Sequence, residues 1–156
     1  PYKIFEILKI KNFQTVIFVT KNNMKAISAK MTNGLNIGSL MVAADNSGAL
    51  LCRITGVKRG KVGRGRQQYA RVADHVKVSV RKGLPDMKGK VFDAIIVRQK
   101  MAYRRLTGER VAFVDNAVVL LKDEKGNPKG TQVKGPVARE VHERWPNVSK
   151  IAKFVL

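Results

Sequence analysis

The sequence predicts a mainly β fold, in which a small barrel is followed by short helices near the C-terminal end. Short apolar segments rich in β-branched residues recur from residue 40, at a spacing typical of small all-β domains. Glycine-rich turns separate these segments, and the pattern changes only after the turn-rich segment at 122–130. The length of 156 residues suits one domain with some additional chain.

The first predicted strands lie on either side of a tight turn. LMVAA at 40–44 is a short apolar run. DNSG at 45–48 is a strong turn, because Asp and Asn bond locally and Gly accepts positive φ. LLCRITGVK at 50–58 begins the next strand, on which Cys52 is interpreted as a small core residue.

Further strands are predicted downstream. HVKVSV at 75–80 alternates apolar and polar residues, as a strand with one buried face does. VFDAIIVRQ at 91–99 has an apolar middle that indicates burial on both faces. RVAFV at 110–114 and AVVLL at 117–121 flank two residues so closely that a bulge or bend is expected between them.

The region from about 136 to 154 is predicted to be helical. Pro136 suits the first residue of a helix, because its missing N–H is not needed there. Val137 and Val141 are four apart, so VAREVHER is predicted as one short helix that ends at Pro146.

A second short helix is predicted for NVSKIAKF at 147–154. Asn147 is expected to cap this helix. Ile151 and Phe154 are expected on its buried face.

Residues 1–23 differ in composition from the rest of the chain. The segment is rich in β-branched and aromatic residues and carries four lysines and one glutamate. It lacks arginine and a small-residue cleavage site, which argues against a standard transit or signal peptide. Two interpretations stay open: an extension that threads along a partner, or upstream sequence with Met24 as the natural start.

The composition indicates a polyanionic partner. The formal net charge is +20, and such a charge attracts nucleic acid or anionic membrane surfaces. No apolar run reaches the length of a transmembrane helix, so no membrane partner is expected.

The residue types predict no cofactor and no metal. Cys52 is the single cysteine, which excludes an intramolecular disulfide and a cysteine-based metal cluster and fits a reducing compartment. His75 and His142 are far apart in the sequence, which argues against a zinc site.

No catalytic constellation is found, so the sequence does not predict an enzyme. GVKRGKV at 56–62 resembles a phosphate-binding P-loop, but its glycine spacing is wrong and no Ser or Thr follows the lysine to bind Mg²⁺. Ser47 lies in a turn rather than at a strand-to-helix elbow. Asp115 beside Asn116 is typical of turn chemistry.

Three basic segments carry the strongest functional signal. RGKVGRGRQQYAR at 59–71 has five cations, three glycines and no acid. The others are KMAYRR at 100–105 and RKG at 81–83, which Lys88 and Lys90 continue. Lys and Arg neutralise phosphates and release counterions, and Arg adds planar bidentate contacts. A flexible loop this cationic is expected to be ordered by a polyanion.

Aromatic and turn residues have separate expected roles. Tyr69 and Tyr103 can stack on an unpaired base, although a tyrosine half-buried against the barrel is the favoured interpretation. The residues expected to fix turns rather than to contact RNA are Asp45, Asn46, Gly48 and Asn116.

Long motifs follow one another in the chain between about residue 24 and residue 156: VAADNSGA at 42–49, AIIVRQKMAYRR at 94–105 with GERVAFVDNAVVL at 108–120, and GNPKGTQVKGPVAREV at 126–141. In this order they resemble the opening strand and turn, the central motif and the closing motif of the universal large-subunit ribosomal protein L-fourteen family. The archaeal branch is the most similar, and the eukaryotic cytosolic branch is next.

The resemblance implies a five-stranded barrel with a protruding ribbon and a short helical C-terminal part. It implies binding of large-subunit rRNA on the face that meets the small subunit, in a cytoplasmic ribosome. The neighbours it implies are ribosomal proteins L-three and L-twenty-four. Thr131, Gln132 and Lys134 lie in the segment similar to the one that faces small-subunit rRNA, and the anti-association initiation factor six docks nearby.

On this interpretation the basic residues bind rRNA phosphates. The predicted rRNA-binding residues are Lys58, Arg59, Lys61, Arg64, Arg66, Arg71, Arg81, Lys82, Lys88, Lys90, Arg98, Lys100, Arg104 and Arg105. Arg139 and Glu140 are expected to orient the C-terminal helix, or one of them to reach RNA.

The chain departs from the family pattern at several positions. RRLTG at 104–108 replaces a Pro-Asp-Gly turn at the ribbon tip, and Val114 replaces a glutamate. Arg71 and Ala73 stand where glycines are usual, which leaves the exit geometry of the basic loop open.

Two other functions are less consistent with the sequence than the ribosomal one. A free-standing architectural or single-strand nucleic-acid binder usually carries more stacking aromatics on one sheet face than this chain has. A mitochondrial form of the same ribosomal protein, with residues 1–23 as a remnant extension, is less consistent with the archaeal-like C-terminal half.

Overall fold

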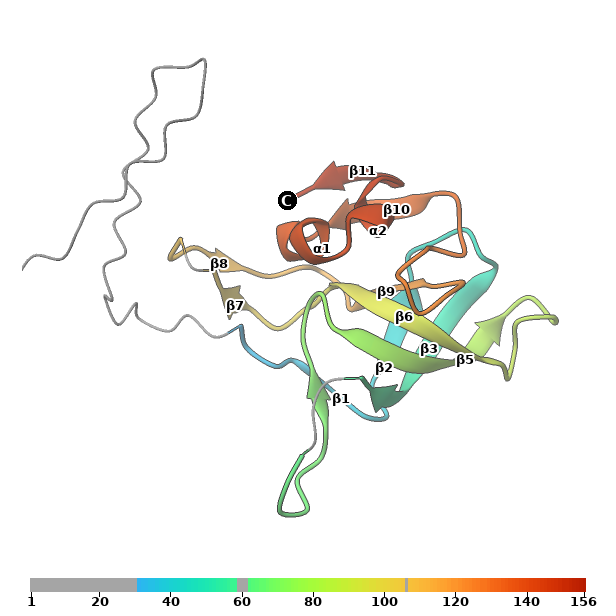
Figure 1. The fold of residues 1–156 in the computed structure, drawn as a ribbon, viewed down its shortest axis with the longest axis horizontal. Helices are drawn as coiled ribbons and strands as arrows, with labels where there is room; N and C mark the ends of the chain where they lie inside the picture. The colour runs from blue at the N-terminus through green and yellow to red at the C-terminus, as the bar shows by residue number, and fades with distance from the viewer. Residues whose placement is uncertain (1–30, 59–61, 106) are drawn as a thin grey trace, which may run out of the picture.

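A closed five-stranded barrel forms the centre of the computed structural model, which describes residues 31–58, 62–105 and 107–156 (Figure 1). Its strands are β2 (Leu40–Ala43), β3 (Ala49–Val57), β5 (His75–Gly83), β6 (Val91–Arg98) and β9 (Ala117–Leu120). Neighbouring strands are antiparallel, except that β2 and β9 close the barrel in parallel. The barrel fold expected from the sequence is therefore confirmed.

The alternation of residue types explains how the strands bury their apolar faces. On β5, Val76, Val78 and Val80 point into the barrel, where they pack in one apolar cluster with Cys52. On β6 the whole run from Ala94 to Val97 is buried. Alternate residues of this strand belong to two different clusters, because the C-terminal segment covers its outer face.

Three short two-stranded sheets surround the barrel. β1 (Leu35–Asn36) pairs with β4 (Tyr69–Ala70) at the base of the basic loop. β7 (Tyr103–Arg104) pairs with β8 (Arg110–Val111) in the expected ribbon, which extends from the barrel in Figure 1. β10 (Val133–Val137) pairs in parallel with β11 (Ala152–Val155).

The first C-terminal helix begins later than the sequence predicts. Helix α1 spans Arg139–Arg144, whereas Pro136 lies within β10 and opens no helix. Pro136 stands at an irregularity of the β10–β11 register, a place where a residue without an N–H is tolerated. Gly135 beside it has a φ of 80°, which breaks any helical start at this point.

The second predicted helix is mostly wrong. Helix α2 spans only Pro146–Ser149, so Asn147 lies inside its first turn and Trp145 takes the N-cap position. The residues after Ile151 form β11, and Phe154 is 68% exposed instead of buried. Pairing with β10 satisfies the backbone of this segment, whereas a helix this short is marginal by itself. Ile151 packs against the apolar cluster as expected.

Several sequence-based expectations lie outside the described residues. These are the extension at 1–23 and the cations Arg59 and Lys61. In the part of the chain that the structure describes, no helix is long and apolar enough to cross a membrane.

Candidate nucleic-acid interface

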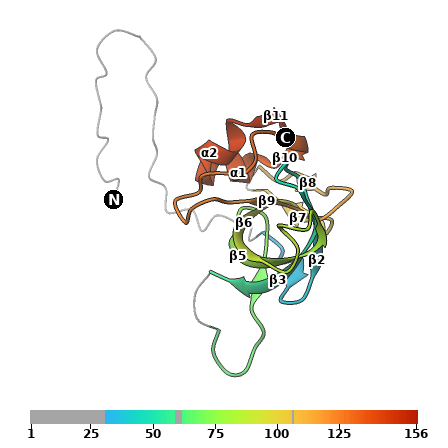
Figure 2. The ribbon, with the colours of Figure 1, turned by 90° about the vertical axis from the view of Figure 1, so that its right-hand side faces the viewer.

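The basic loop, the segment at 59–71, leaves the barrel from two ends that are held by hydrogen bonds. The N–H of Lys58 donates to the His75 carbonyl at 3.0 Å, and the N–H of Val57 donates to Gln68 Oε1 at 3.3 Å. Asn36 pairs with Tyr69 across β1 and β4 on the other side. Figure 2 shows the loop extending well beyond the strands. The loop therefore presents its tip to solvent from two anchored stems.

The described tip of the loop exposes its arginines. Arg64 and Gly65 both adopt positive φ, 58° and 68°, which turns the chain sharply at this point. Arg64 and Arg66 are exposed, and with Val62 and Tyr69 they line a shallow hollow. Tyr69 is 43% exposed and is available for stacking.

The cations at the two ends of the loop, Lys58 and Arg71, have partners within the chain. Lys58 Nζ lies 2.6 Å from Glu124 Oε1 and 3.3 Å from Asp93 Oδ1. The hydrogen bond to Glu124 raises the pKa of Lys58, so this ammonium stays charged. Arg71 is only partly exposed and has partners within the chain. Neither cation is as free to bind phosphate as those at the tip.

The ribbon divides its polar residues between two faces. Arg104 and Arg110 face each other across β7 and β8, and both are exposed, as is Lys100 before β7. Tyr103 is buried, so it cannot stack on a base. Two like charges directly opposite each other destabilise a strand pair unless an anion lies between them. Arg110 is not among the rRNA-binding residues predicted from the sequence, since its position opposite Arg104 depends on the pairing of β7 with β8.

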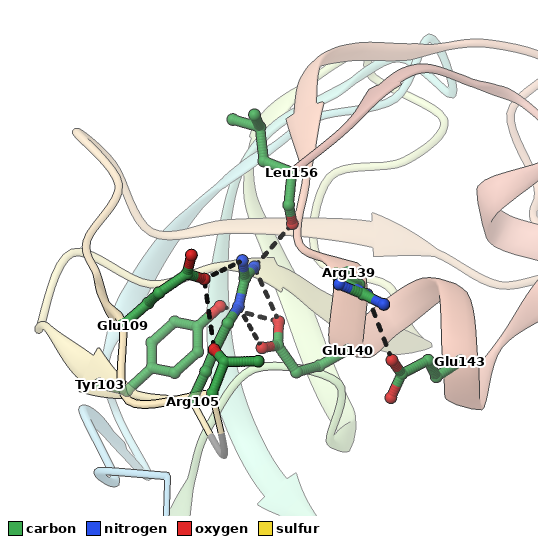
Figure 3. A network of polar contacts seen from close by, with 8 residues as sticks. Tyr103, Arg105, Glu109, Arg139, Glu140, Glu143 and Leu156 are labelled. Carbon is green, nitrogen blue, oxygen red and sulfur yellow. Dashed lines mark hydrogen bonds and ion pairs between the residues drawn. The ribbon is translucent and has the colours of Figure 1, made fainter.

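Beneath the ribbon, one carboxylate joins β7 to helix α1 (Figure 3). Glu140 accepts hydrogen bonds from Tyr103 Oη at 2.8 Å and from Arg105 Nε at 2.7 Å. Arg105 Nη2 also donates to the main-chain oxygen of Leu156 at 2.7 Å. Arg105, which the sequence assigns to rRNA, therefore directs its guanidinium into the protein.

The proton affinities in this network follow from burial and hydrogen bonding. Burial opposes the charge of Glu140, but the hydrogen bonds from Arg105 and Tyr103 outweigh it and lower the pKa of the carboxyl. Burial and the Glu140 bond raise the pKa of Tyr103. The bond to Glu140 likewise raises the pKa of Arg105. The network is thus an ion pair with a neutral tyrosine.

Arg98 is also directed inward. Its guanidinium forms a two-point contact with Asp115, at 2.8 and 3.0 Å, and donates to the carbonyls of Lys134 and Pro136 at 2.9 Å. The side chain is 8% exposed. Its role in the structure is to join β6, the bend before β9, and β10.

The third basic segment lies at a different end of the barrel. Its cations Arg81, Lys82, Lys88 and Lys90 are all exposed. The turn between β5 and β6 is anchored by Met87, which is buried and whose N–H donates to the Leu84 carbonyl at 3.0 Å. Figure 1 shows this turn on the side of the barrel opposite the ribbon. The three basic segments therefore face different directions.

The segment predicted to face the small subunit is held by a residue far away in the sequence. Asn46 Oδ1 accepts from the N–H groups of Thr131 and Gln132, and Asn46 Nδ2 donates to Thr131 Oγ1 at 2.8 Å. The N–H of Lys134 donates to the Ala44 carbonyl at 2.6 Å. Thr131, Gln132 and Lys134 have exposed side chains. The sequence predicts that Asn46 fixes a turn, but it does not predict this contact with Thr131 and Gln132.

The other predicted turn residues form one local bond and two bonds to residues further away in the sequence. Asp45 is buried, accepts from Ser47 Oγ at 2.7 Å and also accepts from the N–H of Leu120 at 3.0 Å. Asn116 Oδ1 accepts from the N–H of Lys100 at 2.8 Å. Gly48 has a φ of 93°, as the turn requires. Ser47 is therefore a turn serine.

Two further observations concern the reactivity of Cys52 and the groups that could bind a metal ion. Cys52 is fully buried in the barrel, and burial raises the pKa of its thiol to about 11, so it is not a nucleophile at neutral pH. Across 31–58, 62–105 and 107–156, no three His, Cys, Asp or Glu side chains group in a way that could hold a metal ion.

The chain is similar in sequence to known proteins over most of its length. The sequence model described as ribosomal protein L14p/L23e matches residues 34–156. The chain belongs to this family. Similar proteins named large ribosomal subunit protein uL14 occur in Nanoarchaeum equitans (strain Kin4-M), with 49% identity, and Methanocorpusculum labreanum, with 45% identity. Each alignment covers 133 residues, 85% of this chain and 100% of the relative.

Family membership gives this L14p/L23e protein its general role. A third relative, uL14 of Methanococcus maripaludis, is 46% identical over 85% of this chain and 99% of its own length. The family consists of ribosomal structural proteins, so the chain is a structural constituent of the large ribosomal subunit and not an enzyme.

Proposed function

We propose that this chain binds large-subunit rRNA through the tip of its basic loop and through its ribbon. Four exposed arginines carry the proposal: Arg64 and Arg66 on the loop, and the cross-strand pair Arg104 and Arg110 on the ribbon. None of the four forms an ion pair with a described residue. Phosphates would neutralise these charges and relieve the repulsion across the ribbon.

The distribution of acids supports the same proposal. Asp74, Asp115 and Glu140 pair with Arg144, Arg98 and Arg105, and Asp45 accepts from the N–H of Leu120. These four acids are therefore engaged away from the exposed arginines of the loop tip and the ribbon. Lys100 and the cations of the turn between β5 and β6 are assigned as further phosphate contacts. Arg98 and Arg105 are left out, because their guanidinium groups are directed inward.

The place in the ribosome is proposed from the family resemblance. The chain lies at the subunit interface, where Thr131, Gln132 and Lys134 contribute to a bridge to small-subunit rRNA and an anti-association initiation factor docks nearby. Ribosomal proteins L-three and L-twenty-four are the proposed neighbours, in a cytoplasmic ribosome. The relatives at 45–49% identity are archaeal, which gives the mitochondrial alternative no support.

A double substitution in the loop tests rRNA binding. Arg64→Ala with Arg66→Ala in the full chain should lower the affinity for a large-subunit rRNA transcript about tenfold or more. It should also reduce the slope of log affinity against log salt by roughly one per lost phosphate contact. The fold should not change, because the loop tip is exposed.

The matched control removes the same charge elsewhere. Lys122→Ala with Lys125→Ala removes two exposed cations from the turn after β9. If binding depends on the loop itself, this control retains affinity and slope. Equal losses in both double variants would mean that only net charge matters and would remove the loop from the proposed interface.

A further inference from the structure

Helix α1 is only six residues long, yet residues at its two ends contact both elements assigned to rRNA. Glu140 in its first turn bonds to the ribbon through Tyr103 and Arg105. Arg144 in its last turn and Trp145 directly after it bond to the exit of the basic loop. Ribbon and loop are far apart in the sequence and do not pair with each other, so this helix connects them.

The contact at the ribbon is partly buried, with the side chains of Arg105 and Glu140 only 15% and 17% exposed. Figure 3 shows Tyr103 and Arg105 converging on the Glu140 carboxylate from the strand side, while Arg105 Nη2 also donates to the main-chain oxygen of Leu156. The same Leu156 oxygen accepts from the N–H of Arg139 at 2.6 Å. Charge-assisted hydrogen bonds in a partly buried site fix orientation more firmly than surface pairs do.

The contact at the loop exit holds a strained backbone. Ala73 has a φ of 65°, in the left-handed region that favours glycine. Its N–H donates to the Ile96 carbonyl at 2.9 Å, and its carbonyl accepts from Trp145 Nε1 at 2.9 Å. Next to it, the buried Asp74 accepts from Arg144 Nη1 at 3.2 Å and from the N–H of Arg71 at 3.1 Å. Strain of this kind persists only where the surroundings fix the residue.

We propose that Glu140 and Trp145 are positioning residues for rRNA recognition, which set the ribbon and the basic loop relative to each other through helix α1. The inference rests on the proposed rRNA contacts of those two elements. Holding both in the bound arrangement beforehand reduces the conformational entropy lost on binding. Neither side chain needs to contact the RNA.

Glu140 allows a test in which positioning and charge predict opposite results. An acid near RNA repels phosphate, so removal of any carboxylate should strengthen binding if only charge matters. Glu143 offers the matched control, because it lies on the same helix and is 66% exposed. Glu140→Gln and Glu143→Gln change the net charge equally, but only the first removes a carboxylate that holds the ribbon through charge-assisted hydrogen bonds.

The experiment compares the two variants in the full chain. The probe is a full-length large-subunit rRNA transcript of Nanoarchaeum equitans, the organism from which the relative with 49% identity comes. We expect Glu140→Gln to bind about threefold to tenfold more weakly than the unmodified chain, which corresponds to part or all of one charge-assisted hydrogen bond. Glu143→Gln should bind equally well or slightly more tightly.

Footprinting of the RNA backbone assigns the effect to an element. Nucleotides that lose protection in Arg104→Ala with Arg110→Ala define the ribbon footprint, and those lost in Arg64→Ala with Arg66→Ala define the loop footprint. Glu140→Gln should weaken the ribbon footprint and keep the loop footprint. Trp145→Phe, which removes the donor to Ala73, should do the reverse.

Two results for Glu140→Gln would overturn the inference. Equal affinities of Glu140→Gln and Glu143→Gln, or loss of both footprints together, would show that helix α1 does not position the elements separately. No specific footprint from the unmodified chain would contradict the proposed function itself. Circular dichroism checks whether Glu140→Gln folds. If it does not fold, Tyr103→Phe takes its place, because this variant removes one hydrogen bond to Glu140 and retains the aromatic ring. An unchanged ribbon footprint in Tyr103→Phe would then contradict the inference.

Discussion

Arg98 and Arg104 lie close together in the sequence, but their guanidinium groups have different surroundings. Arg98 donates four hydrogen bonds to one carboxylate and two carbonyls, whereas Arg104 is exposed and faces another arginine. An arginine whose donors are used inside the protein contributes to stability, and one with free donors contributes to binding. At the scale of single residues, the hydrogen-bond partners and not the residue type decide the role.

Substitution of these two arginines should therefore give opposite results. Arg98→Ala should lower the free energy of unfolding by about 2–4 kcal/mol, because it leaves carbonyls and a carboxylate without their donor. Arg104→Ala should leave stability within about 0.5 kcal/mol and reduce the salt slope of rRNA binding by roughly one. Urea unfolding and binding titrations at several salt concentrations measure both. Similar stability losses in the two variants would contradict this assignment.

Glu140 gives the folded protein a specific dependence on pH. Its pKa is lower in the folded state than the usual value of 4.5, so its contribution to stability is complete above that value and is lost as the pH falls through the folded-state pKa. The melting temperature of the unmodified chain should therefore fall more steeply below pH 4.5 than that of Glu140→Gln. Melting curves between about pH 6 and pH 3 test this. Parallel curves would mean that the carboxylate does not stabilise the fold.

At the scale of elements, anchored bases and exposed tips recur in this protein. The basic loop is held at its stems by β1, β4 and His75, and the turn between β5 and β6 is held by Met87. Arg64 and Arg66 lie beyond the anchored stems, and the exposed Lys88 lies next to the buried Met87. Such an arrangement brings charge to a folded RNA without requiring the cations to pack against the barrel.

Tyr69 at the stem of the loop is suited to stacking on an unpaired base. It is 43% exposed and borders the hollow that Arg64 and Arg66 line. Tyr69→Ala should weaken rRNA binding by about 1–3 kcal/mol, the usual effect of losing one base–aromatic stack, whereas Tyr69→Phe should retain most of the affinity. The salt slope should stay the same in both variants. Equal affinity of the Ala and Phe variants would exclude stacking.

The whole molecule carries a net charge of +20, because its 31 lysines and arginines far outnumber its 11 acids. Long-range attraction of this kind brings the protein to any polyanion, but it is screened by salt. Contacts from three separate directions, in contrast, are expected to hold the protein in a folded RNA when screening is strong. Integration into the subunit and loose adsorption therefore differ in their response to salt.

Sedimentation of a cell lysate through sucrose gradients at low and high salt distinguishes these two modes. We expect the chain to sediment with the large subunit and to remain there after a high-salt wash. Arg64→Ala with Arg66→Ala should be released at lower salt than the unmodified chain. Complete release of the unmodified chain at moderate salt would indicate peripheral electrostatic binding.

The sequence by itself determined the barrel strands, the buried Cys52 and the family, and the resemblance to that family implied the ribbon. These follow from residue alternation, turn chemistry and ordered motifs, which are local properties of the chain. The bend before β9 was likewise predictable, because too few residues separate the flanking segments.

Only the tertiary structure decided the features that depend on contacts between residues far apart in the sequence. Pairing between β10 and β11 placed Pro136 in a strand and left Phe154 exposed, since a parallel pair satisfies more backbone groups than a marginal helix does. The inward direction of Arg98 and Arg105 depends on carbonyls and carboxylates far away in the sequence. The positive charge of a side chain can be read from the sequence, but whether that charge faces RNA or a buried acid depends on residues that only folding brings together.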